Sequence, residues 1–523
     1  MTGTLRLLRL VLRRDRFVLP FWVLGLGLLP YVYASGFDTL FATAQERVEY
    51  ARISAANAGF VALYGPLHGD SIGELVVWRG GFVPVMVGLA ALLTVIRHTR
   101  ADEEAGRTEL IRATVVGRFA PMAAALLATV AAGLVMGVIV TVTLIGHGMP
   151  TGGSVALGVV FAVSAWVFAG VGAVAAQLSG TARGARAIGV LILGATWVLR
   201  LAGDMSATGD GSLAWLSWLS PIGWVHRVFP FGADDWWPVV LTFVATLVTV
   251  VLSAYLLTRR DLGGGLLAGR PGPAGAAPSL RSPVALAWRL HRGLLFGWVA
   301  GFAALGLIFG AVASSVVALA EDSAGVGEMF ARIGGSDGVL DGYFGTVAPI
   351  CGVLSACYAV QAALRIRDEE QAGHAEAILS TDVSRIAWAA GHLLFVLAGP
   401  AAALLAEGLM TGLVHGDVVL MVEVALVQLP AVWVLAGLAM LLIGVVPRAA
   451  AGAWAGIAVV LLLMLAGPLL GFDQWVLDLS PFTHVPQLPG AGFTAVPLMN
   501  LTLIAAALGG AGLLALRRRD VPG

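Results

Sequence analysis

Runs of about twenty apolar residues recur along this chain, and they constrain its fold more than any other feature. A helix of that length crosses a hydrocarbon core about 30 Å thick. Of the 523 residues, 59% are hydrophobic and 12% are charged, which leaves more apolar surface than a water-facing globule can bury. The sequence therefore predicts an all-α integral membrane protein with about 12 transmembrane helices. We place them near residues 17–35, 80–97, 119–145, 154–178, 187–203, 237–257, 293–318, 347–364, 386–412, 418–445, 453–471 and 496–516.

The basic residues, all of them arginine, set the expected orientation. If the N-terminus is in the cytoplasm, most arginines fall on the cytoplasmic side, from the basic N-terminal segment to Arg517, Arg518 and Arg519. Reversing the topology would place them outside, against the positive-inside rule. We therefore expect a multi-pass membrane protein with both termini in the cytoplasm.

The two halves of the chain repeat each other in sequence. We expect a first transmembrane half at 1–260, a flexible Gly- and Pro-rich cytoplasmic linker at 261–285 and a second transmembrane half at 286–523. Each half has an even number of predicted spans, which predicts two parallel, pseudo-symmetric six-helix halves. The matches pair Arg13 with Arg289, Arg16 with Arg292, Trp22 with Trp298, Leu219-Ser220-Pro221 with Leu479-Ser480-Pro481, and Arg259-Arg260-Asp261 with Arg518-Arg519-Asp520.

The longest match lies between the second and third predicted spans of each half, where residues 100–118 align without gaps on residues 367–385. Gly106 and Gly373 occupy the same position and let the backbone turn at no Cβ cost, so we expect a short helix after each. In the first copy, Glu109 is expected beside the apolar Leu110, a combination that suits docking into a groove on a soluble partner. A solvated helix that only tethers two spans is the alternative, and the repetition favours docking.

A basic amphipathic segment precedes the first span of each half. Helical spacing places its arginines on one stripe, with Leu5, Leu8 and Leu12 to one side, as in a helix lying on an anionic membrane surface. Lipid anchoring and contact with a partner explain these arginines equally well. They are Arg6, Arg9, Arg13 and Arg16, with Arg289 and Arg292 at matching positions in the second half.

Several kinds of chemistry are not expected in this chain. Because lysine is absent, the phosphate-binding loop ending in Gly-Lys-Ser/Thr is excluded, and we expect no nucleotide-binding, catalytic or cofactor site. The two cysteines, Cys351 and Cys357, have no partner at metal-ligand spacing, so no metal site is expected. The net charge is zero and no basic tract is dense enough to indicate nucleic-acid binding.

The motif Arg-x-Asp-Glu-Glu-Ala-Gly-Arg-x-Glu-Leu from Arg100, the basic entry helix and the Leu-Ser-Pro triplet together resemble the type-2 ABC transporter permeases. The chain is similar to a fused two-half subgroup of polyketide-antibiotic exporters, the tetronasin-resistance-like permeases. The resemblance implies ATP-driven multidrug efflux of hydrophobic small molecules, and thus antibiotic resistance, with two copies of a separate cytoplasmic ABC ATPase subunit that bind ATP and Mg. It also implies that the matched loops are coupling helices, which contact that ATPase through Glu103, Glu104, Gly106, Arg107, Glu109, Ile111, Arg112, Arg118, Glu370, Gly373, Glu376, Ile378 and Arg385.

Candidate residues for a substrate path lie within or beside the predicted spans. Glu407 and Glu423 could meet a cationic substrate, or they could reach the interface or pair with each other. As proton relays together with His392, they would instead make the chain a proton-coupled secondary multidrug transporter, the main alternative function. The segments before the sixth and twelfth spans are rich in aromatics such as Phe229 and Phe231, which by default anchor a chain at the membrane interface. The resemblance instead implies a pair of short re-entrant helices as an outer gate, with breaks at Pro221 and Pro230. The path candidates are Trp22, Phe82, Met86, Trp197, Trp298, Tyr358, Glu407 and Glu423.

Overall fold

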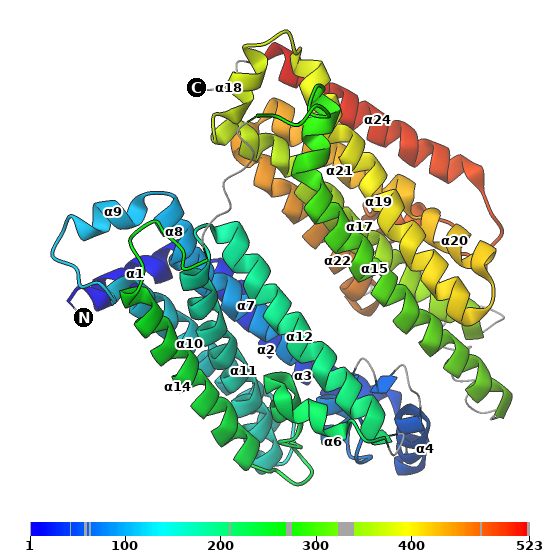
Figure 1. Cartoon of the computed structure of the whole chain (residues 1–523). Coiled ribbons are helices and arrows are strands. Elements are labelled where there is room, and N and C mark those ends of the chain that lie inside the picture. Colours follow the sequence, from blue (N-terminus) through cyan, green and yellow to red (C-terminus); the bar gives the residue numbers. More distant parts are fainter. Residues whose placement is uncertain are drawn as a thin grey trace. The chain divides into compact units, whose positions relative to one another are not determined.

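The computed structural model describes residues 2–41, 43–56, 60–61, 64–208, 211–267, 275–322, 339–470 and 473–519. Throughout these ranges the regular secondary structure is helical. Twelve segments among the described residues are long and apolar enough to cross a membrane, which confirms the all-α, multi-span prediction. The chain divides into two compact units, Met1–Gly272 and Pro273–Gly523, which are taken one at a time (Figure 1).

Unit 1 holds six of the candidate spans, at Val18–Leu40, Val83–Glu104, Ala120–Gly146, Thr151–Leu178, Ala182–Ala207 and Trp237–Thr258. Its described helices are α1 (Thr4–Arg14), α2 (Val18–Gly27), α3 (Leu29–Leu40), α4 (Ala44–Ala56), α6 (Ile72–Arg79), α7 (Val83–His98), α8 (Arg100–Glu104), α9 (Arg107–Arg112), α10 (Ala120–Gly146), α11 (Thr151–Leu178), α12 (Ala182–Thr208), η1 (Ala214–Leu219), α13 (Pro221–His226) and α14 (Trp237–Thr258).

Unit 2 holds the other six, at Pro283–Ala313, Tyr343–Gln371, Arg385–His415, Val418–Val445, Pro447–Met464 and Ala495–Arg518. Its described helices are α15 (Pro283–Asp322), α17 (Val339–Gln371), α18 (His374–Leu379), α19 (Arg385–His415), α20 (Val418–Leu426), α21 (Leu429–Val445), η2 (Pro447–Gly452), α22 (Ala453–Leu470), α23 (Gln474–Leu477), η3 (Pro481–His484) and α24 (Ala495–Arg518).

The most deeply buried span of unit 1 is α11, because α7, α10, α12 and α14 all pack against it. Glycines let these helices approach closely, as small residues do in lipid. A Cβ atom built on Gly137 of α10 would lie 2.6 Å from the carbonyl oxygen of Gly158 of α11. A Cβ on Gly88 of α7 would lie 2.5 Å from the ring of Phe168. Helix α11 is therefore the centre around which unit 1 is assembled.

Unit 2 contains two long helix pairs, α15 with α19 and α21 with α24. Where α21 crosses α24, a Cβ on Gly444 would lie 2.2 Å from the carbonyl oxygen of Gly512. A Cβ on Gly512 would in turn lie 2.4 Å from the carbonyl oxygen of Met440. In lipid, helices associate through close packing of this kind, because apolar side chains gain little by leaving an apolar solvent.

The basic entry segment is a separate helix in unit 1 but not in unit 2. Helix α1 ends at Arg14, and the chain bends before α2 begins at Val18. The bend holds Asp15, whose buried carboxylate lies 2.6 Å from Nε2 of His98. At the aligned position unit 2 has His291, and α15 runs on without a break. The second predicted entry helix is therefore the first part of one 40-residue helix.

The repeated Leu-Ser-Pro triplets start short helices before the last span of each unit. Ser220 accepts a hydrogen bond from the N–H of Gly223 at 3.1 Å, and Ser480 accepts one from the N–H of Phe482 at 3.3 Å. The proline occupies the first helical position in both, where a missing N–H is harmless. The break expected at Pro230 lies in the turns after α13.

Part of the predicted 261–285 linker is attached to unit 1. Residues 268–274 lie outside the described residues. Just before them, the N–H groups of Leu266 and Leu267 donate to the carbonyls of Gln177 and Leu178, at 3.2 and 2.8 Å. After them, α15 already begins at Pro283.

We predict that Gly512→Ala destabilises unit 2, because the added methyl must displace the backbone of Met440. Overpacking of this kind costs about 1–3 kcal/mol. Gly510→Ala on the same helix is the control, since a Cβ there meets nothing within 4 Å. Thermal unfolding of the purified proteins should give a lower midpoint for Gly512→Ala only, and equal midpoints would contradict the assignment of this crossing.

Candidate functional site

Glycine turns lie in both matched loops, as the sequence predicts. Gly106 has φ 71° and Gly373 has φ 72°, in the left-handed region that L side chains rarely adopt. A short helix follows each turn, α9 in unit 1 and α18 in unit 2. We call residues 100–112 and 367–379 the first and second glycine-turn segments.

An ion pair ties the first glycine-turn segment to the chain that leaves the last span of unit 1. The two terminal nitrogens of Arg260 donate to the carboxylate of Glu103, at 2.6 and 2.7 Å. The N–H of Gly263 donates to the same carboxylate at 2.7 Å, and Nε of Arg260 donates to Gln177 at 2.7 Å. The side chains of Arg260 and Glu103 are only 6% and 7% exposed. A buried bidentate pair of this kind fixes geometry as well as charge.

The same ion pair occurs in unit 2 at the matching positions. Arg519 donates to the buried carboxylate of Glu370, and Arg367 donates to that carboxylate at 3.0 Å. We call Glu103 with Arg260, and Glu370 with Arg519, the two clasps. The sequence match between the two Arg-Arg-Asp ends thus corresponds to a repeated contact.

A second contact is repeated beside each clasp. Arg118 donates to the carbonyl of Leu257 at 2.6 Å and to that of Arg260 at 3.2 Å. Arg385, at the matching position in unit 2, donates to the carbonyl of Arg519. The carbonyl groups in the last turn of a helix, and those just after it, have no N–H partner within the helix. These guanidinium groups supply the missing hydrogen bonds.

Two further side chains attach the first glycine-turn segment to neighbouring helices. Glu104 accepts from the N–H of Ala182 at 2.8 Å, at the positive end of the α12 dipole. Arg100 is 1% exposed and donates to the carbonyls of Ala176 and Gly264, at 2.9 and 2.8 Å. The segment is therefore fixed to α11, to α12 and to the chain beyond α14.

Contacts that the sequence reasoning missed join the entry helix to the same segment. Asp102 lies 2.6 Å from Arg14 and 2.7 Å from Arg107. Asp15 contacts His98 and lies 3.1 Å from Arg97. The available signal was Asp15 itself, an isolated acid in a basic N-terminal segment.

The predicted entry-helix arginines remain exposed rather than joining these contacts. Leu5 and Leu12 beside them are also exposed, at 76% and 44%. Such a surface of arginine and leucine is expected of a helix that lies on an anionic membrane. The exposed arginines are Arg6, Arg9, Arg13 and Arg16 in unit 1, and Arg289 and Arg292 on α15.

The tip of the first glycine-turn segment is open to its surroundings. Leu110 is 76% exposed and Val115, just beyond α9, is 88% exposed. Glu109 is exposed beside them, as is Glu376 in the second segment, where Ala377 replaces the leucine. Ile111 and Ile378 are half-buried, and the side chain of Arg112 lies outside the part that the structure describes.

The path residues predicted in unit 1 do not converge on one site. The rings of Phe82 and Trp197 meet edge to face with centroids 6.2 Å apart. Trp22 belongs to the main hydrophobic core, and Met86 is 42% exposed.

The path residues predicted in unit 2 comprise one aromatic pair and two carboxylates in different surroundings. The rings of Trp298 and Tyr358 lie 6.1 Å apart between centroids. Glu407 is buried and accepts from Thr411 of its own helix at 3.1 Å, whereas Glu423 is exposed on α20. These two carboxylates therefore have different surroundings.

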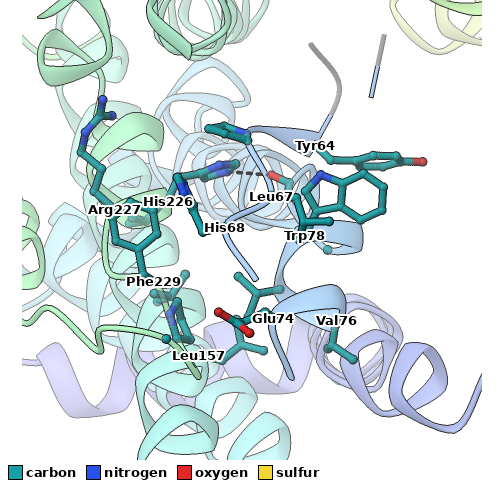
Figure 2. A pocket seen from close by; sticks show the side chains of 18 of the residues that line it. Tyr64, Leu67, His68, Glu74, Val76, Trp78, Leu157, His226, Arg227 and Phe229 are labelled. Carbon is teal, nitrogen blue, oxygen red and sulfur yellow. Dashed lines mark hydrogen bonds between the residues drawn. The ribbon is translucent and has the colours of Figure 1, made fainter. Parts of the chain in front are cut away.

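A cavity of about 540 Å³ lies in unit 1 (Figure 2). It is at the ends of α7 and α12 that lie opposite the first glycine-turn segment. Its walls come from α3, α6, α11, the start of α7, the end of α12 and residues 225–233. Sequence reasoning missed this pocket because its residues come from stretches far apart in the chain. Side chains that line it include Tyr64, His68, Glu74, Trp78, Phe161, Asp204, His226, Arg227 and Phe229.

Most polar groups in the pocket wall have partners within unit 1. Asp204 accepts from Ser217 at 2.8 Å, and its carboxylate lies 3.6 Å from Arg200 and 3.9 Å from Arg227. The imidazole of His226 donates from Nε2 to the carbonyl of Gly81 at 2.8 Å. Burial lowers the pKa of His226 to about 3, so this ring is neutral at physiological pH.

We predict that Glu103→Gln opens the first clasp, because Arg260 is left buried without its counter-charge. Breaking such a pair costs about 3 kcal/mol. Hydrogen–deuterium exchange of residues 257–267 should rise, and the thermal midpoint should fall. Glu109→Gln, at an exposed position of the same segment, should change neither.

The second clasp provides an internal control. Glu370→Gln should raise exchange at the end of α24 and leave residues 257–267 unchanged. Identical exchange in Glu103→Gln and Glu109→Gln would show that the clasp has no structural role.

The chain is similar to multidrug efflux permeases over nearly its whole length. A family model described as "Multidrug efflux system permease Rv1217c, C-terminal domain" matches residues 6–257 and 280–517. The multidrug efflux system permease protein Rv1217c of Mycobacterium tuberculosis (strain ATCC 25618 / H37Rv) is 42% identical over 529 residues, covering 99% of this chain and 95% of the relative. Together with the twelve candidate spans, these matches show that the chain is a multi-pass membrane protein that belongs to the Rv1217c-like family of multidrug efflux permeases.

Proposed function

We propose that this chain is the transmembrane permease subunit of an ATP-driven ABC exporter of the type-2, tetronasin-resistance-like class. It moves hydrophobic, antibiotic-like molecules out of the cell, and its two glycine-turn segments dock on two copies of a cytoplasmic ATPase subunit. The observation that carries the proposal is the first glycine-turn segment itself. Its base, residues 100–104, is firmly attached to neighbouring helices, whereas its tip around Glu109 and Leu110 is exposed, apolar and acidic. The similarity to Rv1217c, a multidrug efflux system permease protein, supports the drug-efflux part.

The base of the segment gives its short helix a fixed shape. Helix α9 has six residues, too few to be stable alone in water. The clasp at Glu103 and the contact of Glu104 with Ala182 hold the chain on either side of the glycine turn in place. A tip that already has its bound shape loses little conformational entropy when it docks. More of the free energy gained by burying the exposed Leu110 is therefore available for binding.

Two helices connect this segment to the pocket at their other ends. Helix α7 starts next to the pocket-lining Gly81 and Pro84 and ends at His98, just before the segment. Helix α12 starts at Ala182, which Glu104 holds, and reaches the pocket at Asp204. A helix the length of α7 is about 24 Å long. A tilt imposed at the segment would therefore move the pocket wall.

In the proposed complex both termini and both glycine-turn segments face the cytoplasm of a bacterial cell. The two halves form a parallel, pseudo-symmetric repeat in the plasma membrane. ATP and Mg are bound by the partner subunit, and this chain supplies the docking tips, the path and the helices that move it.

The structure gives less support to proton-coupled transport. The candidate relays Glu407 and Glu423 have separate surroundings, and His392 lies 2.9 Å from His291 as part of a buried histidine pair. Reconstituted vesicles separate the two functions. Export that requires the ATPase and ATP and persists when the proton gradient is collapsed supports the proposal, whereas export by the chain alone along a proton gradient overturns it.

We predict that Glu109→Arg strongly reduces ATPase binding, because the charge at the docking tip is reversed. The chain would be purified from membranes with the ATPase co-expressed, and bound ATPase quantified, with about a tenfold loss expected for a lost charge-assisted contact. Glu46→Arg, at an exposed position of α4, is the matched control and should retain the partner. Full ATPase recovery and drug resistance with Glu109→Arg would contradict the docking assignment.

We predict that Gly106→Val impairs efflux while Gly106→Asn is tolerated. A Cβ at Gly106 meets nothing within 4 Å, so the substitution acts through backbone conformation alone. Asn adopts the left-handed region far more readily than a β-branched residue. Drug resistance of cells that express equal amounts of each variant is the measurement, and equal resistance for the two would contradict a required left-handed turn.

A further inference from the structure

The pocket of unit 1 has the size and lining of a small-molecule site. Its volume of about 540 Å³ falls within the range of roughly 300–1,000 Å³ that ligand pockets occupy. Aromatic rings of Tyr64, Trp78, Phe161 and Phe229 contribute to its walls, together with aliphatic side chains such as Leu157. The acidic and basic side chains in the wall are His68, Glu74, Asp204, His226 and Arg227. Binding sites commonly combine a mainly apolar lining with a small number of polar groups of this kind.

Glu74 presents its charge to the middle of the pocket. Figure 2 shows its carboxylate pointing into the space between Phe229 and the wall that carries Trp78. Among the described residues its hydrogen bonds are to Ser71, whose N–H and hydroxyl donate at 3.2 and 2.6 Å. Gly69 leaves room for it, because a Cβ there would lie 2.1 Å from its Oε1.

The positive group in the wall is turned away from this space. Arg227 extends away from the pocket centre in Figure 2, with its guanidinium 4.8 Å from the ring centroid of Trp218 and 3.9 Å from Asp204. The two histidines do not add positive charge, because burial lowers the pKa of both His68 and His226. A ligand in the pocket therefore meets the Glu74 carboxylate and aromatic faces.

The loop that closes one side of the pocket is held in a strained conformation. Phe229, Phe231 and Asp234 have φ values of 46°, 65° and 46°, which are unfavourable for side chains larger than glycine. The ring of Phe231 anchors this loop, since it occupies space that a Cβ on Gly73 or Gly153 would fill, at 2.4 and 2.2 Å. Strain of this kind persists where the surroundings enforce it, and it is concentrated at ligand sites.

We propose that this pocket binds drug-sized aromatic cations, with the cationic nitrogen at Glu74 and the ring system against Trp78, Tyr64 and Phe229. A carboxylate supplies the counter-charge, and the aromatic faces attract a cation further. The biological meaning of this site rests on the proposed export function, in which the bound cation is cargo. Its position at the ends of α7 and α12 places it where motion of the glycine-turn segment would arrive.

Glu74→Gln isolates the charge, because glutamine keeps the capping box that Glu74 forms with Ser71 at the start of α6. The full chain in lipid nanodiscs would be titrated by fluorescence polarisation with tetramethylrhodamine methyl ester, a cation, and with fluorescein, an anion built on the same xanthene ring system. Empty nanodiscs give the background. We expect saturable binding of the rhodamine ester, weakened about tenfold to a hundredfold by Glu74→Gln, and no saturable binding of fluorescein.

Glu49→Gln is the matched control, because Glu49 is an acid of unit 1 that lies outside the pocket lining, pairs with Arg52 and has a side chain that is 43% exposed. It should leave the affinity unchanged and so exclude a general attraction of the dye to acidic groups. Ala233→Trp, at an exposed lining position, should abolish binding by filling the pocket and does not depend on Glu74. Unchanged affinity in Glu74→Gln, or equal binding of fluorescein, would overturn the proposal. The assay needs no ATPase, so binding here together with failed ATPase docking would refute only the proposed coupling.

Discussion

A charge placed among apolar helices must be matched by an opposite charge nearby, and this requirement organises the ends of both units. Each clasp joins a carboxylate at the end of the second span of its unit to an arginine just after the last span. These partners are 157 and 149 residues apart in sequence. Removal of either partner would leave the other charge buried and unpaired, so each clasp holds its two segments together. In this way it fixes the base of the glycine-turn segment next to the end of the last span. The exposed tip depends on this buried base for its shape.

The sequence predicted those features that follow from short-range physical rules. Span length and hydropathy located the helices, and the left-handed turns followed from Gly106 and Gly373. Contacts between segments far apart in the chain were harder to predict from the sequence. We predict that Glu103 and Glu104 contact a partner protein, but the sequence does not indicate the contacts that they make within the chain, with Arg260 and Ala182. A carboxylate at the end of a span needs hydrogen-bond donors or an opposite charge, but its neighbours in the sequence do not show which group folding brings to it.

The pocket could not be predicted from the sequence, for a related reason. Glu74 forms a capping box with Ser71 in the structure, and nothing near it in the sequence indicates that its carboxylate also faces a cavity. Phe229 and Phe231 read as interfacial aromatics, although their positive φ angles place them in a strained closing loop. One side chain can satisfy a local rule and contribute to a distant site, and only the first role leaves a pattern in the sequence.

The two units share their clasps but differ in how their first helices enter. In unit 1 the chain bends around the buried Asp15, whereas α15 in unit 2 continues for 40 residues from its amphipathic start into the apolar body. A continuous helix of that length is a rod of about 60 Å, which resists bending over most of its length. A sideways force applied at its exposed start would swing the far end in the opposite direction, as a lever does about a fulcrum. In unit 1 the same force would change the angle of the bend at Asp15 instead. The first helices of the two units would therefore differ in stiffness under an identical force.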